Sequence, residues 1–250
     1  MTPNKLNLDG QVAVVTGAAR GIGRATVDLM RARGARIVAS DISETVRELE
    51  GADVATLVGD VADEHVAKRT MALAMECFGR VDILVNNAGR TLNKSLLDTS
   101  LAEWEAVMAT NARGAFVQSR EAVRAMVASG RGGAIVSVVS VVAAVAMKDL
   151  SAYAASKGAI TQLVKVIAAE YGSMGIRANA VAPGVVETDI LQGIGVADSR
   201  VTLASFGGVH PIGRVAQADE IAEVIAFLAS PAASFMTGAL VMADGGYSAI

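Results

Sequence analysis

The sequence has few of the residues that build disulfides or metal sites. It contains one cysteine, Cys77, and two histidines, His65 and His210. A single cysteine excludes an internal disulfide, and the paired-cysteine and clustered-histidine spacings of metal sites do not occur. Because the histidines lie far apart in the sequence, we expect each to be a surface or core-edge residue, and we predict no metal site.

A strong charge of one sign and a long apolar run are also missing. The formal net charge is -3 and no basic cluster is interleaved with aromatic residues, so nucleic acid is not an expected partner. The longest uncharged run, 132–147, is shorter than the roughly 20 residues that span a membrane, and serines interrupt it. The first ten residues are polar and lack the layout of a signal peptide, so we expect a cytoplasmic protein without a membrane partner.

What the sequence does have is an alternation of short β-branched runs with longer helical patterns. Of its 250 residues, 52% are hydrophobic, enough for a large core in one α/β domain spanning 1–250. The alternation predicts a doubly wound, Rossmann-type fold, with a parallel seven-stranded sheet and helices on both faces. We expect strands at 12–16, 36–40, 55–58, 83–86, 134–139, 177–181 and 240–243. We expect helices at 21–33, 63–78, 101–129, 152–171 and 218–230.

A glycine-rich turn follows the first expected strand. Thr16 is followed by Gly17, Gly21 and Gly23, in the spacing G-x-x-x-G-x-G. Such glycines permit a tight turn and a close approach of backbone amides to a pyrophosphate at the start of a helix. Asp41 follows the second strand about twenty residues later, where a carboxylate can accept hydrogen bonds from both adenosine ribose hydroxyls. A purely structural turn, and a helix cap at Asp41, are the alternatives.

The stretch around Tyr153 carries the candidate acid/base. Lys157 stands four residues after Tyr153 in a run of good helix formers, and positions i and i+4 lie on one face of a helix. A free tyrosine has a pKa near ~10, but an adjacent positive charge can lower that pKa by roughly one to three units. We therefore expect Lys157 to make Tyr153 a usable proton acceptor. Taken alone, the same pair also occurs by chance in amphipathic helices.

Further motifs lie at the ends of the expected strands and along the helices. Together with the turn at 16–23 they are Asp60-Val61, Asn86-Asn87-Ala88-Gly89, Asn111, Ser140, Tyr153 with Lys157, and Pro183-Gly184 followed by Thr188. This set resembles the short-chain dehydrogenase/reductase family, and the resemblance covers essentially the whole chain. It implies an oxidoreductase that transfers a hydride between a nicotinamide dinucleotide and a secondary alcohol or ketone.

The resemblance implies four catalytic residues. Tyr153 would exchange the proton of the substrate, and Lys157 would hold the nicotinamide ribose and keep the phenolate accessible. Ser140 would donate a hydrogen bond to the substrate oxygen, whereas Ser137 lies on the opposite face of the strand. Asn111 would kink the long helix and hold a water that links Lys157 to solvent. The cofactor would be bound by Gly17, Arg20, Gly21, Ile22, Gly23, Asp41, Ile42, Asp60, Val61, Asn87, Ala88, Gly89, Tyr153, Lys157, Pro183, Gly184, Val186 and Thr188.

Two residues favour different cofactors. Arg20 lies where NADP-dependent relatives often place a basic residue that meets the 2′-phosphate. Asp41 opposes this, because like charges ~4 Å apart cost on the order of 1 kcal/mol in water and about 4 kcal/mol at a protein surface. Residue 42 is Ile rather than Arg, so nothing on that side replaces the lost attraction. We therefore expect NAD rather than NADP.

The stretch 187–211 is the least regular in the chain and contains four glycines. The family uses this region as a lid over the substrate, and an ordinary surface loop is the alternative. A lid here predicts an apolar pocket without an anchoring charge, which favours a neutral and fairly hydrophobic alcohol or ketone. Its residues would be Val141, Val142, Ala143, Ile190, Leu191, Ile194 and Phe206.

Three functions remain open. The first is an NAD-dependent dehydrogenase of secondary alcohols. The second is a 3-oxoacyl-carrier-protein or acyl-CoA reductase using NADPH, which residues 237–246 resemble, although Met174 replaces the usual basic docking residue and Arg131 supplies only part of that patch. The third is a non-catalytic dinucleotide-binding protein, against which the intact catalytic set speaks. The resemblance also implies a homotetramer, with the long helices at 101–129 and 152–171 paired across a two-fold axis.

Overall fold

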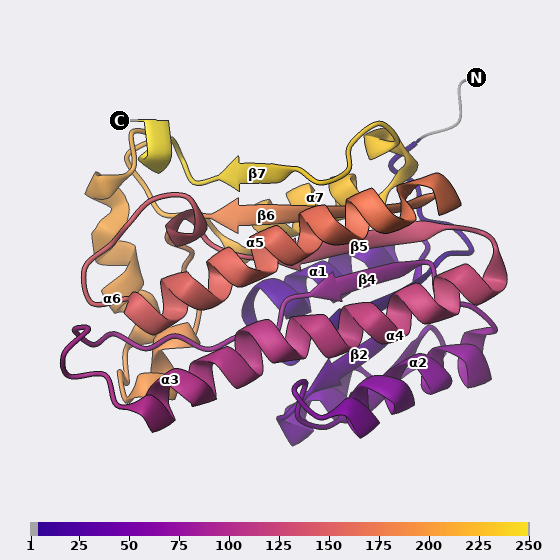
Figure 1. The fold of residues 1–250 in the computed structure, drawn as a ribbon, viewed down its shortest axis with the longest axis horizontal. Helices are drawn as coiled ribbons and strands as arrows, with labels where there is room; N and C mark the ends of the chain where they lie inside the picture. The colour runs from indigo at the N-terminus through magenta and orange to yellow at the C-terminus, as the bar shows by residue number, and fades with distance from the viewer. Residues whose placement is uncertain (1–4, 250) are drawn as a thin grey trace.

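The sheet at the centre of the molecule confirms the predicted Rossmann-type fold (Figure 1). A computed structural model describes residues 5–249, so the first four residues of the polar N-terminal stretch, and Ile250, lie outside the described residues. Seven parallel strands run in the order β3-β2-β1-β4-β5-β6-β7. All seven lie within two residues of their predicted ends: β1 Val12–Thr16, β2 Arg36–Asp41, β3 Val54–Val58, β4 Ile83–Asn86, β5 Gly133–Val138, β6 Ile176–Pro183 and β7 Leu240–Ala243.

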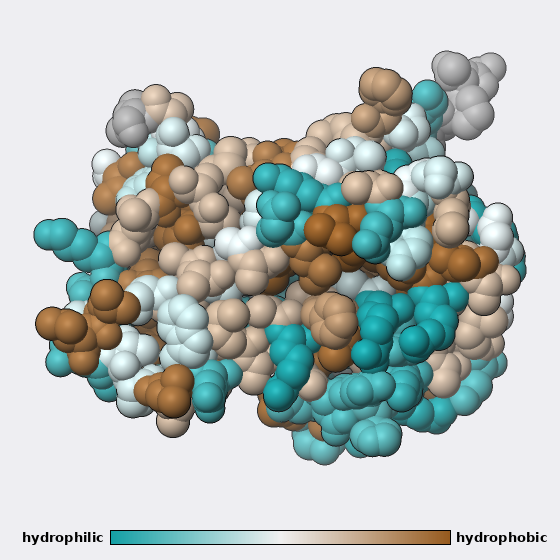
Figure 2. Space-filling view, in the orientation of Figure 1, coloured by the Kyte–Doolittle hydropathy of each residue, from teal (hydrophilic) through white to brown (hydrophobic). Residues whose placement is uncertain are grey.

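Helices cover both faces of the sheet because its strands are apolar on both sides. In β1, Ala13 and Val15 belong to the core cluster under α1 and α7, whereas Val12 and Val14 belong to the cluster under α2, α4 and α5. Figure 2 shows apolar side chains interspersed with polar ones over the face that α4 and α5 form. The covering helices are α1 Gly21–Ala32, α2 Glu64–Phe78, α4 Gly114–Ser129, α5 Ser151–Tyr171 and α7 Ala218–Ala229.

The predicted helix over 101–129 is confirmed, and it carries a π-helical turn at Asn111, where the family resemblance implied a kink. It is divided into α3 Leu101–Met108, a π-helical turn Ala109–Arg113, and α4. A π-helical turn shifts the helix by one residue and occurs mostly at functional sites. Here it buries the side chain of Asn111 inside the fold. The shift leaves the apolar periodicity of the flanking helices intact, so the hydrophobic pattern alone does not reveal it.

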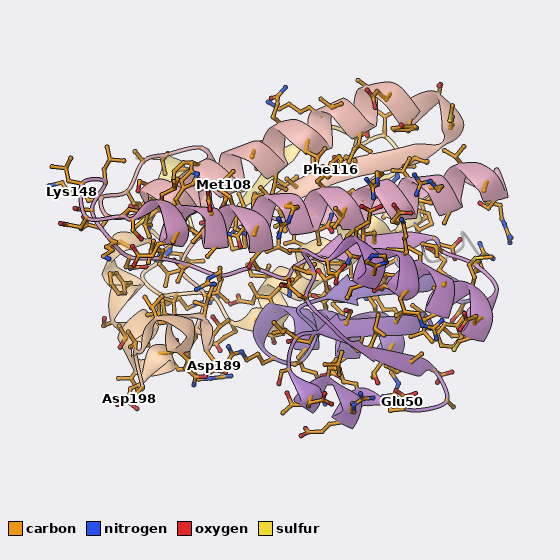
Figure 3. The ribbon with its side chains drawn as sticks, turned by 60° about the horizontal axis from the view of Figure 1, so that its bottom comes forward. Glu50, Met108, Phe116, Lys148, Asp189 and Asp198 are labelled. Carbon is orange, nitrogen blue, oxygen red and sulfur yellow. The ribbon has the colours of Figure 1, made fainter. Side chains whose placement is uncertain are left out.

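The stretch 187–211 consists of short helical turns that cross-link one another. They are Ile190–Ile194, α6 Ser199–Ala204 and Ser205–Val209. The buried side chain of Ser199 donates from Oγ to the backbone oxygen of Thr188 at 2.7 Å. This bond ties the start of α6 to the residues that precede the turn Ile190–Ile194. Figure 3 shows Asp189 and Asp198 at the same end of the molecule as Lys148, which follows β5. This is the end at which the parallel strands finish (Figure 1).

Neither a membrane-spanning helix nor a cluster of metal ligands occurs in the part of the chain that the structure describes. Among residues 5–249, no helix combines the length and the apolar character needed to cross a membrane. Within the same residues, no group of three or more His, Cys, Asp or Glu side chains is placed to hold a metal ion.

Candidate active site

The glycine-rich turn packs against the end of β4 through contacts that larger residues would block. Asn87 donates from Nδ2 to the backbone oxygens of Thr16 and Gly17, at 2.9 and 3.0 Å. A Cβ on Gly23 would lie 2.0 Å from the Gly17 oxygen, and a Cβ on Gly17 would lie 2.7 Å from Ala88 Cα. The structure thus brings these predicted cofactor residues together at one edge of the sheet.

The start of α1 is open to an anion. Arg20 precedes this helix in an extended conformation, and no side chain caps the first turn. Gly21 has a φ of +57°, and the nearest atom to a Cβ there is Thr188 Cγ2, at 3.4 Å. Uncapped amide groups at a helix N-terminus favour a phosphate, so the turn fits a dinucleotide pyrophosphate. Ile22, also predicted here, instead packs against the core under α1 and α7.

Asp41 ends β2 with its carboxylate turned toward the glycine-rich turn. Its Oδ2 accepts from the Ala19 amide and its Oδ1 from the Ser43 amide, both at 2.9 Å. Each carboxylate oxygen keeps a second lone pair, which suits two ribose hydroxyls. The following short helix, Glu44–Leu49, is capped by Ser43, so the alternative that Asp41 is only a helix cap is wrong. Ile42 is 72% exposed and adds no positive charge.

Arg20 contacts the irregular stretch 187–211. Its Nη1 donates to Gln192 Oε1 at 2.7 Å. A hydrogen bond from Arg200 lowers the pKa of Asp189, and the nearby charge of Arg20 acts in the same direction. A 2′-phosphate bound by Arg20 would therefore compete with Gln192 and Asp189 for this guanidinium.

Asn111 links three segments of the site. Its Oδ1 accepts from the Arg90 amide at 2.9 Å, and its Nδ2 donates to the Arg90 oxygen at 3.0 Å and to Ser156 Oγ at 2.9 Å. Ser156 Oγ in turn donates to the backbone oxygen of Tyr153 at 2.7 Å. Because Asn111 is 1% exposed, these bonds are shielded from water. They fix the first turn of α5 against the loop that follows β4.

Ser140 and Tyr153 bring their hydroxyls together beyond the end of β5. Ser140 caps the short turn Val141–Ala143. Ser137, within the strand, is 2% exposed and accepts a bond from Asn86, as a buried strand serine does. Burial of the Tyr153 hydroxyl raises its pKa to about 12, and the hydrogen bond with Ser140 acts in the opposite direction. Tyr153 therefore holds its proton at neutral pH.

Lys157 lies beside Tyr153 but does not lower its pKa as predicted. The Lys157 Nζ donates to the Val138 oxygen at 2.9 Å and lies 5.5 Å from the centroid of the Tyr153 ring. Burial lowers the pKa of Lys157 to about 8. An ammonium has three donors, so two remain for other partners. A Cβ on Gly89 would lie 3.4 Å from both Lys157 Nζ and Asn111 Oδ1. Lys157, on α5, therefore lies close to the loop that follows β4 and to Val138 at the end of β5.

The segment after β6 is held near the glycine turn. The Gly184 amide donates to the Ala243 oxygen at 3.2 Å, and Val186 forms a parallel bridge with Ala216. Thr188 is 8% exposed and approaches Gly21. Pro183 is the buried last residue of β6. The predicted residues on the nicotinamide side thus come from one continuous stretch.

Two predicted cofactor residues lie apart from the catalytic group. Asp60 Oδ1 accepts from the Ala62 amide at 2.9 Å, within the turn that follows β3. Val61 packs against the start of α4, where a Cβ on Gly114 would lie 2.8 Å from its Cγ1. Both follow β3, the edge strand of the sheet.

The residues of the predicted apolar pocket differ in exposure. Val141, Val142 and Leu191 are buried, and Phe206 is 42% exposed. The remaining three, Ala143, Ile190 and Ile194, are partly exposed. The residues from 190–206 are therefore on average more exposed to solvent than those that follow β5.

Three residues at the site were not predicted to be there. His210 was expected at the surface or core edge, but it is 4% exposed and bonded on both ring nitrogens. Ser156 and Gln192 contact Asn111 and Arg20. No short motif marks these positions, because their partners lie far away in the sequence. His65, in contrast, is exposed, as expected.

Known proteins are similar to this chain over nearly its whole length. The family model described as enoyl-(acyl carrier protein) reductase matches residues 17–248. A cis-4-hydroxycyclohexanecarboxylate dehydrogenase of Sinomonas cyclohexanicum is 42% identical, over 96% of this chain and 97% of its own. A 3-oxoacyl-[acyl-carrier-protein] reductase of Thermotoga maritima is 37% identical, over 96% of this chain and 99% of its own. A crystal structure of a short-chain type dehydrogenase/reductase from Mycobacterium marinum has a TM-score of 0.91 at 28% identity, with 99% of each chain covered.

The chain belongs to the short-chain dehydrogenase/reductase family, which confirms the resemblance seen in the sequence. It is an NAD(P)-dependent oxidoreductase that acts on CH–OH groups.

Proposed function

We propose that the protein is an NAD-dependent dehydrogenase of neutral, apolar secondary alcohols, with Tyr153 as the acid/base. The observation that carries this proposal is the pairing of the Ser140 and Tyr153 hydroxyls beside the buried ammonium of Lys157. A proton donor, a second hydroxyl and a positive charge are the groups that carbonyl–alcohol interconversion needs.

The chain's own residues fit the cofactor as follows. The amides of the glycine turn hold the pyrophosphate, and Asp41 accepts the adenosine ribose hydroxyls. Asn87, Ala88 and Gly89 line the adenosine side, with Asp60 and Val61 further out along the same edge. Lys157 binds the nicotinamide ribose, and residues 183–188 contact the nicotinamide. When bound, the nicotinamide supplies the site for the hydride.

Tyr153 transfers the proton, and three further side chains support this step. Tyr153 Oη takes the proton from the alcohol, or returns it to the oxygen in carbonyl reduction. Ser140 Oγ donates to the same oxygen and stabilises the charge that develops there. Lys157, together with the positive charge that an oxidised nicotinamide would bring, would stabilise the phenolate when Tyr153 gives up its proton. Asn111 holds the start of α5 in place and positions a water that connects Lys157 to solvent.

The preference for NAD and for an apolar substrate follows from charge. Asp41 repels a 2′-phosphate, and the exposed Ile42 offers no compensating cation. The segment 187–211 closes over the substrate, and the apolar residues around Val141 and Leu191 carry no charge to anchor an ionised one. The relative named for cis-4-hydroxycyclohexanecarboxylate supports a ring-bearing secondary alcohol as the first substrate to examine, although the named substrate of that relative also carries a carboxylate.

The second candidate is a 3-oxoacyl-carrier-protein or acyl-CoA reductase, which the Thermotoga relative favours. Docking of an acidic carrier needs a basic patch. The exposed Met174 contributes no charge to such a patch, and Arg131 could supply only part of it. These reductases also prefer NADPH, which Asp41 disfavours. A third candidate is a non-catalytic dinucleotide-binding protein. The pairing of the Ser140 and Tyr153 hydroxyls speaks against it, because dinucleotide binding alone does not require a proton donor at this position.

The test is turnover of a Tyr153→Phe variant over a panel of alcohols, sugars and hydroxyacyl thioesters, followed by NADH absorbance. We expect turnover to fall by at least ~10²–10⁴-fold while the cofactor still binds, since only the proton-transfer oxygen is lost. Tyr171→Phe, at the other end of α5, is the matched control and should behave as wild type. Near-normal turnover of Tyr153→Phe would contradict the proposed mechanism. Activity confined to thioesters with NADPH would favour the acyl reductase.

A further inference from the structure

His210 joins the far end of the lid segment to the loop after β6, and the proposed mechanism does not use it. Its side chain is 4% exposed. The Nε2 accepts a hydrogen bond from the Val185 amide at 3.0 Å, and the Nδ1 lies 3.2 Å from the Phe206 oxygen. A buried imidazole with both nitrogens paired is held in one orientation.

These two partners fix the position of the ring proton. The backbone N–H of Val185 can only donate, so His210 Nε2 is the unprotonated acceptor. The backbone oxygen of Phe206 can only accept, so His210 Nδ1 carries the proton. The geometry therefore specifies one of the two neutral tautomers.

The surroundings are shaped to admit this ring. A Cβ on Gly184 would lie 2.7 Å from His210 Nε2, so a larger residue at 184 would block the bond to Val185. The Tyr247 ring packs at 5.8 Å between centroids, with 54° between the planes. The Gly213 amide donates to the His210 oxygen at 2.8 Å. In Figure 1 the last part of the lid lies beside the C-terminal segment, in agreement with these contacts.

We propose that His210 is a positioning residue that makes the lid and the loop after β6 act as one unit. The proposal rests on the proposed function, in which residues 183–188 contact the nicotinamide and residues 187–211 cover the substrate. Val185 lies inside the first segment and Phe206 near the end of the second, so one imidazole sets the distance between them. A misplacement of about 1 Å far from the chemistry can cost ~10²-fold in rate.

The kinetic test compares His210→Ala, His210→Gln and the control His65→Gln. His210→Ala should lower kcat/KM for the alcohol by about 10- to 100-fold and weaken NAD binding, measured by calorimetry, because the nicotinamide-side loop loses its anchor. His210→Gln should recover most of both, since a glutamine oxygen can accept from the Val185 amide. His65→Gln should match wild type. Wild-type kcat, KM and NAD affinity in His210→Ala, or a His210→Gln as impaired as His210→Ala, would overturn the proposal.

The spectroscopic test does not depend on activity or on the stability of the alanine variant. The chain has two histidines, so His65→Gln leaves only the ring signals of His210 in a ¹⁵N–¹H NMR spectrum. We expect the neutral Nδ1–H tautomer at pH 7.5, and an Nε2–H tautomer would overturn the proposal. Calorimetry separates this role from the proposed function. If His210→Ala weakens NAD binding while Tyr153→Phe keeps full turnover, the positioning role of His210 is supported and the proposed acid/base role of Tyr153 is contradicted.

Discussion

Replacement of Asp41 by asparagine tests the cofactor preference with the least disturbance of the fold. Asp41 holds two backbone amides, those of Ala19 and Ser43, each at 2.9 Å. Asparagine has the same shape and can still accept one of these bonds, whereas alanine would lose both and loosen the glycine turn. Asp41→Asn therefore removes the charge and retains more of the loop geometry than Asp41→Ala does.

The magnitude follows from the repulsion that the substitution removes. A carboxylate about 4 Å from a 2′-phosphate charge costs on the order of 1 kcal/mol in water and about 4 kcal/mol at a protein surface. At 1.4 kcal/mol for each factor of ten, kcat/KM with NADP relative to NAD should rise by roughly five- to a thousand-fold. Because Arg20 is bonded to Gln192, part of its attraction for the phosphate is already used, which places the gain toward the lower end.

The assay is kcat/KM with NAD and with NADP for one alcohol, together with thermal denaturation to monitor the fold. Wild type should favour NAD by at least about tenfold, which is 1.4 kcal/mol. Ile42→Arg added to Asp41→Asn should improve NADP use further, since arginine binds phosphate in a bidentate manner. Arg20→Ala in the wild-type background should change NAD kinetics little. A wild type that prefers NADP and loses that preference in Arg20→Ala would refute the role given to Asp41 and favour the acyl reductase.

Two further predictions concern pH and assembly. Burial lowers the pKa of Lys157 to about 8 from an unfolded value near 10.5, so the unfolded chain binds more protons between these values. The free energy of unfolding in urea should therefore rise between pH 8 and 10 in wild type relative to Lys157→Met, by up to about 3 kcal/mol, and parallel pH profiles would contradict this. We also propose a homotetramer, because Phe116, Val127 and Val166 on α4 and α5 are 46%, 42% and 42% exposed. Light scattering should give four times the 25.5 kDa chain mass, and a monomer at micromolar concentration would refute it.

The parts of the fold that follow from local pattern were predicted well. Strands such as β1 are continuous apolar runs, and Gly17 and Gly23 stand where a Cβ would clash with neighbouring backbone atoms. The same holds for Tyr153 and Lys157, whose helical spacing places them side by side whatever surrounds them. Local spacing is sufficient in these cases because the relevant contacts lie within one element or one turn.

The parts that local pattern does not reveal depend on contacts between distant segments. The kink at Asn111 was expected only from the family resemblance, and the π-helical turn there is stabilised by Arg90 and Ser156, which lie 21 and 45 residues away. The role of His210 depends on Val185, 25 residues earlier. The sign of the pKa shift at Tyr153 depends on how far its hydroxyl is buried, a property of the whole fold. A pattern of residue types carries none of this information.

Burial also determines the proton state in which the active site rests. It acts on Tyr153 and Lys157 in opposite directions, because it disfavours whichever form is charged: it raises the pKa of the phenol to about 12 and lowers that of the ammonium to about 8. At pH 7 the proton therefore remains on Tyr153 and the positive charge remains on Lys157. Such a site is ready to donate a proton to a carbonyl oxygen. To accept a proton from an alcohol, Tyr153 needs more positive charge nearby than Lys157 alone provides, and an oxidised nicotinamide would bring that charge.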